Sequence, residues 1–126
     1  MEYRRLGSSG LFVSAIGLGG NTFGRFCDAD QTARIVHQAL DLGVNFIDTA
    51  DLYSNGVSEE YIGRAIADRR DKVILATKTG FPLGEGPNDK GLSRRRIVAS
   101  LEASLRRLGT DYVDVYYLHL PDPNTP

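Results

Sequence analysis

Short apolar runs alternate with amphipathic segments along this chain, and that alternation constrains its fold more than any other feature. The apolar runs, typical of strands, cover residues 15–18, 44–47, 73–77 and 112–118. The run 73–77 is apolar almost without interruption, as in a strand that is covered on both faces. Because strands that alternate with helices are joined by right-handed crossovers, the sequence predicts an α/β fold with a parallel sheet.

Three helices are predicted between these strands from the spacing of apolar residues and from capping residues. The first covers about 30–42. The second follows Ser58, interpreted as its N-cap, with the charge of Glu59 favourable in the first turn. The third is capped by Ser93 and closed by Gly109.

Polar side chains follow three of the four predicted strands directly, at their carboxyl ends. They are Asp48, Lys78 and His119. Taken singly, they could be a helix cap, a solvated lysine and a structural histidine. In a parallel βα barrel, however, these strand ends converge on one mouth, where the chemistry takes place. A doubly wound dinucleotide fold is less favoured, since the predicted helix does not start on the glycine-rich turn 17–24.

The chain is too short for a closed barrel, which typically needs about 250 residues. Its 126 residues are predicted to form an incomplete half-barrel of four strands and three helices, the N-terminal half of such a domain. Residues 1–14 are expected to form a hairpin that covers the barrel floor. Residues 121–126 end in a Thr-Pro pair typical of a helix start, which predicts a truncated link to a missing fourth helix. The open sheet edges favour self-association.

Composition and charge exclude several classes of protein. A formal net charge of -1 gives no reason to expect nucleic acid or an anionic membrane as a partner. No apolar run reaches spanning length, no signal-peptide core is visible, and the single cysteine, Cys27, allows no internal disulfide, so the expected location is the cytoplasm. No spacing typical of metal ligands is present, and His37 is interpreted as a surface residue. The run 94–96 of three arginines is interpreted as solvated.

Three motifs give the chain a resemblance to a known family. Residues 46–53 (FIDTADLY), followed by Ser58 and Glu59, resemble the aldo/keto reductase signature around its catalytic aspartate and tyrosine. Residues 76–78 (ATK) are similar to that family's third-strand lysine segment, and residues 104–119 to its helix-then-strand histidine segment. The match covers essentially the whole chain. Within the family, the sequence most resembles the bacterial group that also resembles potassium-channel β subunits.

The resemblance implies an NADP-dependent enzyme that transfers hydride reversibly between NADPH and an aldehyde or ketone. Its catalytic positions correspond to Asp48, Tyr53, Lys78 and His119. Tyr53 would donate the proton, Lys78 would stabilise the phenolate, Asp48 would hold the lysine, and His119 would orient the carbonyl oxygen. These residue types suit the chemistry, because an ordinary phenol has a pKa of about 10 and a nearby ammonium favours its ionised form.

The resemblance also implies contacts for the cofactor and the substrate. The positions that match the family's cofactor contacts are Gly20, Asn21, Thr22 and Asp48. The candidate walls of the substrate pocket are Phe23, Phe26 and Phe81. The expected cofactor is NADP(H), and the expected partner is a small-molecule carbonyl compound.

Two alternatives stay open at this point. In the first, the half-barrel is catalytically incompetent and serves as a binding or structural module that needs a partner chain. In the second, Lys78 forms a Schiff base with a carbonyl substrate, as in barrel aldolases. The flanking motifs favour the reductase over the Schiff-base enzyme.

Overall fold

A computed structural model describes residues 1–126, and it contains the predicted parallel sheet. The sheet has the order β3-β4-β5-β6, with every neighbouring pair parallel. Its strands are β3 (Leu18–Gly19), β4 (Phe46–Asp48), β5 (Ile74–Thr79) and β6 (Val115–Leu118). Because sequence order and spatial order coincide, each crossover adds the next strand at the same edge, which is how a βα barrel grows.

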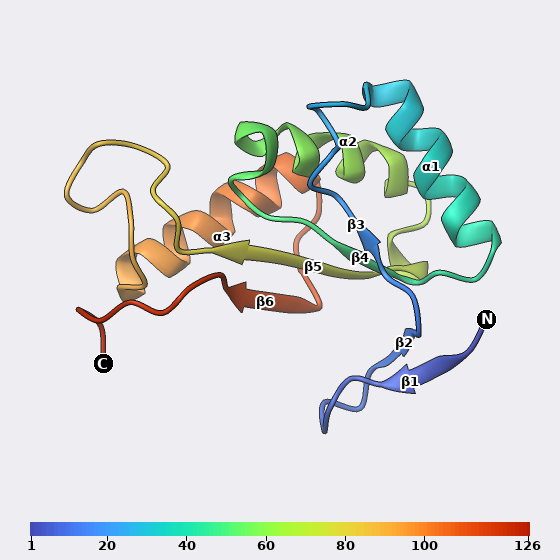
Figure 1. The fold of residues 1–126 in the computed structure, drawn as a ribbon, viewed down its shortest axis with the longest axis horizontal. Helices are drawn as coiled ribbons and strands as arrows, with labels where there is room; N and C mark the ends of the chain where they lie inside the picture. Colours follow the sequence, from blue (N-terminus) through green and yellow to red (C-terminus); the bar gives the residue numbers. More distant parts are fainter.

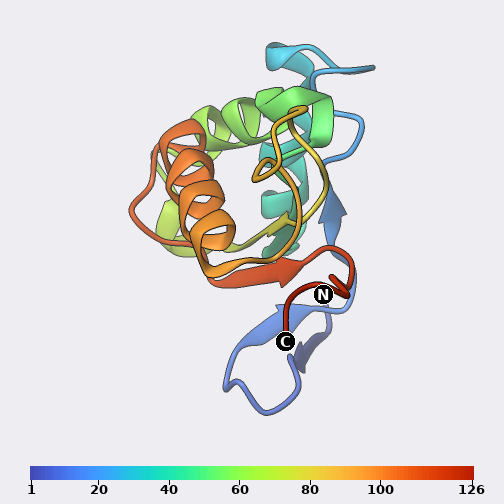
Figure 2. The same ribbon diagram turned by 90° about the vertical axis from the view of Figure 1, so that its left-hand side faces the viewer.

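Helices α1 (Ala29–Asp41), α2 (Val57–Ile66) and α3 (Arg94–Leu108) lie on one side of this sheet (Figure 1). Turned by 90°, the same arrangement shows α2 between the other two helices (Figure 2). Two short 3-10 helices, η1 (Tyr53–Gly56) and η2 (Arg70–Lys72), precede α2 and β5. The predicted α/β half-barrel of four strands and three helices is therefore confirmed.

An antiparallel hairpin precedes the sheet, as predicted, and is formed by β1 (Tyr3–Arg5) and β2 (Phe12–Ser14). Asn45, directly before β4, anchors it: its side-chain oxygen accepts from the Ser14 amide at 2.7 Å. Its amide nitrogen donates to Phe12 O at 3.0 Å. The hairpin is thus held at the amino end of β4, opposite to the strand ends that carry the candidate site (Figure 1).

The hydrophobic core lies between the sheet and the helices. Its nine buried members are Phe23, Val36, Ile47, Ile62, Ala65, Ile66, Val73, Leu75 and Leu108. Helix α2 supplies three of them, Ile62, Ala65 and Ile66, which form its inward face. Gly63 on the same helix lets α3 approach closely, since a Cβ there would lie 2.6 Å from the Leu108 carbonyl carbon.

Three local predictions about the first strand and the helices were wrong. The first strand is only two residues long, because Ala15 pairs instead with the hairpin through its amide and Glu2 O at 2.9 Å. Helix α1 agrees with its prediction to within one residue and follows Asp28, whose side chain accepts from the Gln31 amide at 2.8 Å in a capping box. His37 is not a free surface residue, since its Nε2 lies 2.8 Å from Ala65 O and joins α1 to α2. Ser58 does not cap α2.

Helix α2 begins at Val57 and is preceded by Gly56, which adopts a left-handed conformation with φ of 91°. Ser58 is therefore already inside the helix, where it is completely buried and uses its hydroxyl for tertiary contacts. Glu59 is buried as well, so its charge is not simply a favourable surface charge in the first helical turn.

Candidate active site

The carboxyl ends of β4, β5 and β6 form a common rim. The register pairs Asp48 with Ala76, and Lys78 with Tyr117. Side chains alternate across a strand, so Asp48 and Lys78 share the face that points away from the helices. Thr77 on the other face is completely buried beneath them. The rim therefore presents its charged groups together on the open side of the sheet.

Lys78 is the centre of this rim, because its ammonium donates three hydrogen bonds. Its Nζ lies 2.5 Å from Asp48 Oδ2, 2.8 Å from Thr49 O and 3.2 Å from the Tyr53 hydroxyl. A lysine ammonium has three protons, and each is directed to one of these oxygens. The three oxygens take up the hydrogen-bonding directions of Nζ, which favours an ion-pairing role for Lys78 over the Schiff-base alternative.

Tyr53 reaches Lys78 from η1, the turn that follows β4. Ser54 and Asn55 in this turn have positive φ angles of 51° and 53°, which non-glycine residues rarely adopt. The hydroxyl of Ser54 donates to Phe23 O at 2.7 Å, which fastens η1 to the loop after β3. The tight turn places the phenol ring 4.8 Å from Lys78 Nζ, measured to the ring centroid.

His119 lies on the other side of the rim, where its amide donates to Thr79 O at 2.8 Å. Its ring meets Phe81 edge-on at a centroid distance of 4.8 Å and Tyr53 at 6.0 Å. Burial lowers the pKa of His119, the charge of Lys78 lowers it further, and Asp48 opposes the change. The imidazole is consequently neutral at neutral pH, with one nitrogen able to donate a hydrogen bond and one able to accept.

A hollow of about 500 Å³ opens in front of these residues. It is lined by Gly17, Leu18, Gly19, Phe46, Asp48, Lys78, Tyr117, Leu118 and His119. Asp48 Oδ1 is buried and has no hydrogen-bond partner, so it offers an acceptor to a bound molecule. No atom lies within 4 Å of where a Cβ of Gly19 would be.

The three loop residues matched to cofactor contacts differ in their surroundings. Gly20 is buried. Its amide donates a hydrogen bond to Asp48 O at 2.8 Å, and its carbonyl oxygen accepts one from the Ser58 hydroxyl at 2.7 Å. Asn21 and Thr22 are exposed. Asn21 lines a second hollow of about 490 Å³ that also borders Tyr53. Gly20 therefore fixes the loop to the rim, and the two residues after it are the ones with accessible side chains.

Sequence reasoning missed two residues that connect the rim to α2. Thr49 Oγ1 and Ser58 Oγ are 2.9 Å apart, and both side chains are completely buried. Because the single hydroxyl proton of Ser58 is directed to Gly20 O, Thr49 must be the donor between the two hydroxyls. Ser58 was interpreted as an N-cap because serine is common there. The same residue type at the same position also suits the buried hydrogen-bonding role that the structure shows.

A buried ion pair lies behind the rim and was not predicted either. Arg107 Nε of α3 lies 2.6 Å from Glu59 Oε2 of α2, and the hydroxyl of Thr77 in β5 donates to Glu59 Oε1 at 2.6 Å. The Glu59 side chain is fully buried, whereas that of Arg107 is 24% exposed. This pair joins two helices to the central strand beneath the candidate site.

The three candidate pocket walls are not equivalent. Phe23 is a core residue with 1% exposure, so the prediction that it lines a pocket is wrong. Phe81 packs against His119 at the rim. Phe26 is 70% exposed and has Arg25 stacked over its ring at 4.8 Å.

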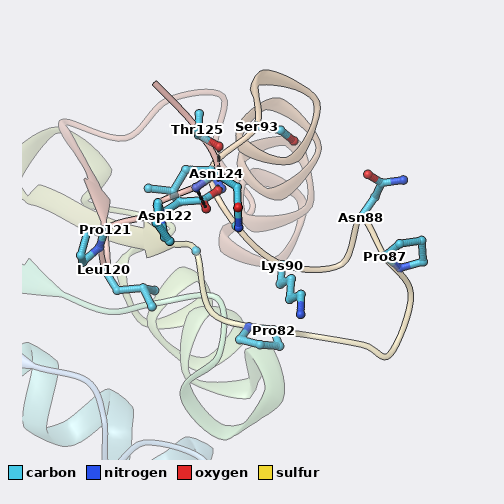
Figure 3. Close-up of a pocket in the computed structure, with 14 residues that line it drawn as sticks. Pro82, Pro87, Asn88, Lys90, Ser93, Leu120, Pro121, Asp122, Asn124 and Thr125 are labelled. Carbon is cyan, nitrogen blue, oxygen red and sulfur yellow. Dashed lines mark hydrogen bonds between the residues drawn. The ribbon is translucent and has the colours of Figure 1, made fainter.

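A separate pocket of about 430 Å³ lies between the loop that follows β5 and residues 120–125 (Figure 3). None of the four catalytic candidates lines it. Asp122 closes one side by accepting from the Leu92 amide at 2.9 Å and from the Thr125 hydroxyl at 2.6 Å. The Thr125 bond, followed by the Leu92 and Asn124 amides, lowers the pKa of Asp122.

Comparison with known proteins identifies the family. Residues 15–126 match the model described as the aldo/keto reductase family. The chain belongs to the aldo/keto reductase family. An aldo-keto reductase from Bacillus halodurans in its holo form, AKR11C1, shares its fold with a TM-score of 0.80 and 41% identity. That comparison covers 94% of this chain and 40% of the solved one.

Curated relatives within the family are similar to the whole chain. A probable voltage-gated potassium channel subunit beta from Oryza sativa subsp. japonica is 48% identical over 130 residues, and this chain covers 39% of it. Aldo-keto reductase YhdN from Bacillus subtilis is 42% identical, with 40% of its length covered. L-glyceraldehyde 3-phosphate reductase from Escherichia coli is 40% identical, with 38% covered. The chain thus spans about two fifths of the length of these family members.

Two further structural observations concern other classes of site. No helix combines the length and the apolar character that crossing a membrane requires. No three side chains among His, Cys, Asp and Glu lie close enough together to hold a metal ion.

Proposed function

We propose that this chain supplies the catalytic residues of an NADP(H)-dependent aldo/keto reductase site that reduces an aldehyde or ketone to an alcohol, reversibly. The observation that carries the proposal is the ammonium of Lys78, which donates to Asp48 and Tyr53 at the rim. A phenol in contact with an ammonium is suited to give up a proton, because the positive charge stabilises the phenolate that remains.

Each member of the set has a distinct part in the proposed reaction. Tyr53 donates a proton to the carbonyl oxygen as negative charge develops on it, and Lys78 stabilises the phenolate that remains. Asp48 keeps the ammonium in place through its 2.5 Å contact. The neutral imidazole of His119 donates a hydrogen bond to the same carbonyl oxygen and so orients it and stabilises its charge.

The residues at the hollow fit a nicotinamide cofactor. When bound, NADPH supplies the hydride that is added to the carbonyl carbon. Asp48 Oδ1, buried and without a partner, is suited to accept a hydrogen bond from a hydroxyl of the cofactor. We propose that Asn21 and Thr22 contact the cofactor directly, while Gly20 contributes by holding their loop on the rim. One hydride from NADPH, which is a hydrogen nucleus with two electrons, and one proton from Tyr53 would together supply the two hydrogens that the alcohol gains, so the reduction balances.

The test uses the 126-residue chain with fluorescence titration of NADPH and a turnover assay on a panel of aldehydes and ketones. One relative is named for L-glyceraldehyde 3-phosphate, so this compound belongs in the panel. Tyr53→Phe is expected to keep NADPH binding and to lose most turnover. Tyr61→Phe in α2 is the matched control. Full turnover by Tyr53→Phe would contradict the proposal, whereas a wild-type chain that neither binds NADPH nor turns over any member would favour the second candidate function below.

A second candidate function is a binding or structural role in which another chain covers the open sheet. The observation in its favour is that β3 and β6 form the two edges of the sheet and that Leu118 is 56% exposed. Unpaired edges of this kind favour association with another strand. Size-exclusion chromatography with light scattering tests this role, and a monomer at all concentrations, with no partner strand bound, speaks against it.

A further inference from the structure

Arg107 of α3 packs against η1, the turn that carries Tyr53. A Cβ at Gly56, the last residue of η1, would lie 2.7 Å from Arg107 Cδ and 2.9 Å from Arg107 Nε. These distances are too short for a side chain at this position, so the stem of the arginine lies directly on the Gly56 backbone. Gly56 is buried, and the Arg107 side chain is 24% exposed. Helix α3 therefore reaches the candidate site through one long side chain.

The direction of the Arg107 side chain is fixed by its hydrogen bonds. Its Nε donates to Glu59 Oε2 at 2.6 Å, and its Nη2 donates to Ser104 Oγ at 3.2 Å. The carboxylate of Glu59 is fixed in turn, because the Thr77 hydroxyl donates to its other oxygen at 2.6 Å. The Glu59 side chain is fully buried, so its charge is balanced by Arg107 rather than by water. The arginine consequently has one well-defined position, which is set by α2 and β5 as well as by its own helix.

The backbone that Arg107 contacts has an energetically costly conformation. Ser54, Asn55 and Gly56 follow one another with positive φ angles of 51°, 53° and 91° and form a left-handed turn. Non-glycine residues keep such angles only where their surroundings determine the conformation. One support of the turn is the Ser54 hydroxyl, which donates to Phe23 O at 2.7 Å. The second is the contact of Arg107 with Gly56, so the turn is held by the loop after β3 and by α3.

We propose that Arg107 is a positioning residue that holds the left-handed turn in place and so keeps Tyr53 beside Lys78. Glu59 acts through Arg107, because it directs the arginine onto the turn. Tyr53 directly precedes the turn, and its hydroxyl lies 3.2 Å from Lys78 Nζ. Relaxation of the turn toward ordinary backbone angles would therefore move the phenol ring. The inference rests on the proposed function, since this placement matters for catalysis only if Tyr53 is the proton donor.

Stability alone gives no reason for an ion pair at this place. Apolar side chains of similar volume often serve a fold as well or better, because they avoid the cost of removing two charges from water. An ion pair differs from such side chains in direction, since a guanidinium donates along fixed lines and so determines where the arginine stem lies. The pair of Arg107 and Glu59 is explained by the place that it gives to this stem.

Nuclear magnetic resonance on the 126-residue chain tests this placement without any cofactor. The rings of Tyr53 and His119 meet edge-on with centroids 6.0 Å apart, so a nuclear Overhauser effect joins their ring protons. The rings of Phe81 and His119, 4.8 Å apart, give a second such signal that does not involve η1 and serves as the internal reference. Arg107→Ala is expected to reduce the ratio of the first signal to the second to less than half of the wild-type value, because the turn relaxes and Tyr53 moves.

Further variants accompany Arg107→Ala. Arg106→Ala removes an exposed arginine from the preceding position of α3 and should leave the ratio unchanged. Arg107→Lys keeps the positive charge and most of the stem, so its ratio should stay above half of the wild-type value; a lower ratio counts against the inference. If urea denaturation shows that Arg107→Ala does not fold because Glu59 is left unpaired, the neutral double variant Glu59→Gln with Arg107→Ala takes its place and should show the same loss.

An unchanged ratio in folded Arg107→Ala, or in the double variant, would overturn the inference. This includes equal weakening of both signals, since that indicates a general loosening rather than a moved turn. A double variant that does not fold also counts against the inference, because the contact would then support the whole fold. A reduced ratio together with full turnover by Tyr53→Phe would contradict the proposed function and leave the placement by Arg107 intact.

Discussion

Replacement of Gly63 by alanine tests the close approach of α2 and α3 that supports the rim. A Cβ at this position would lie 2.6 Å from the Leu108 carbonyl carbon and 2.7 Å from its Cα. The Leu108 carbonyl oxygen would be closer still, and ordinary contacts begin at 3.4 Å, so the helices must separate by about 1 Å at this point. Main-chain atoms cannot rotate away as the end of a side chain can. Leu108 is 2% exposed, so separation would also loosen its packing in the core.

Two effects of opposite sign decide the outcome. Alanine inside a helix is favoured over glycine by up to about 1 kcal/mol, whereas overpacking costs roughly 1–3 kcal/mol. Because the obstructing atoms belong to the backbone of α3, we expect the upper part of that range and a net loss of about 2 kcal/mol. With a urea dependence of about 2 kcal/mol/M, the midpoint should fall by about 1 M.

Circular dichroism of the chain in increasing urea measures this change. The exposed neighbour Arg64 provides the matched control, because Arg64→Ala and Arg64→Gly compare the same two residue types on the same helix without the close approach. Arg64→Ala should be the more stable of the two by up to about 1 kcal/mol. A Gly63→Ala variant as stable as the wild type, or more stable, would refute the steric reasoning.

Three further predictions concern single side chains at the rim and the adjoining loop. Ser58→Ala leaves two buried oxygens without their hydrogen bonds and should lower the free energy of unfolding by about 1–3 kcal/mol in the same urea assay. By NMR, His119 should titrate below the ordinary value of about 6.5, and Lys78→Met should raise its midpoint. Just below pH 6.5 the imidazole is protonated in the unfolded chain more than in the folded one, so the free energy of unfolding should increase as pH rises through this window. The hydrogen bonds that Asp122 accepts should be present above about pH 3.9 and lost as pH falls through its lowered folded-state pKa, which hydrogen exchange of the Leu92 amide detects. Asp122→Asn should remove this pH dependence, because the amide does not titrate.

The order of strands and helices could be predicted because it depends on periodicity, which is a property of many residues together. The placement of Asp48, Lys78 and His119 on one rim also follows from order alone, since each directly follows an apolar run that became a parallel strand. The register of the sheet then brings these three strand ends to the same edge.

Roles that depend on a single hydroxyl or charge were beyond sequence reasoning. Ser58 satisfies the requirements of a helix cap and of a buried hydrogen-bonding residue equally well, and only the position of Gly20 O decides between them. Glu59 and Arg107 are far apart in sequence, and nothing local indicates that one would neutralise the other inside the molecule. Arg96 stands in a run of three arginines that was interpreted as solvated, yet its Nε and Nη2 are buried. The general preference of arginine for solvent outweighs any local signal there.

The link from Gly20 through Ser58 and Thr49 to the rim divides the loop after β3 into an anchor and a variable part. The anchor is Gly20, whose amide donates to Asp48 O and whose carbonyl accepts from the Ser58 hydroxyl. The next two residues are exposed to solvent. An engineer who exchanges residues 21–22 for those of another barrel can therefore keep Gly20 and Ser58 and vary the exposed part of the loop, while the hydrogen bonds of Lys78 to Asp48 and Tyr53 are left as they are.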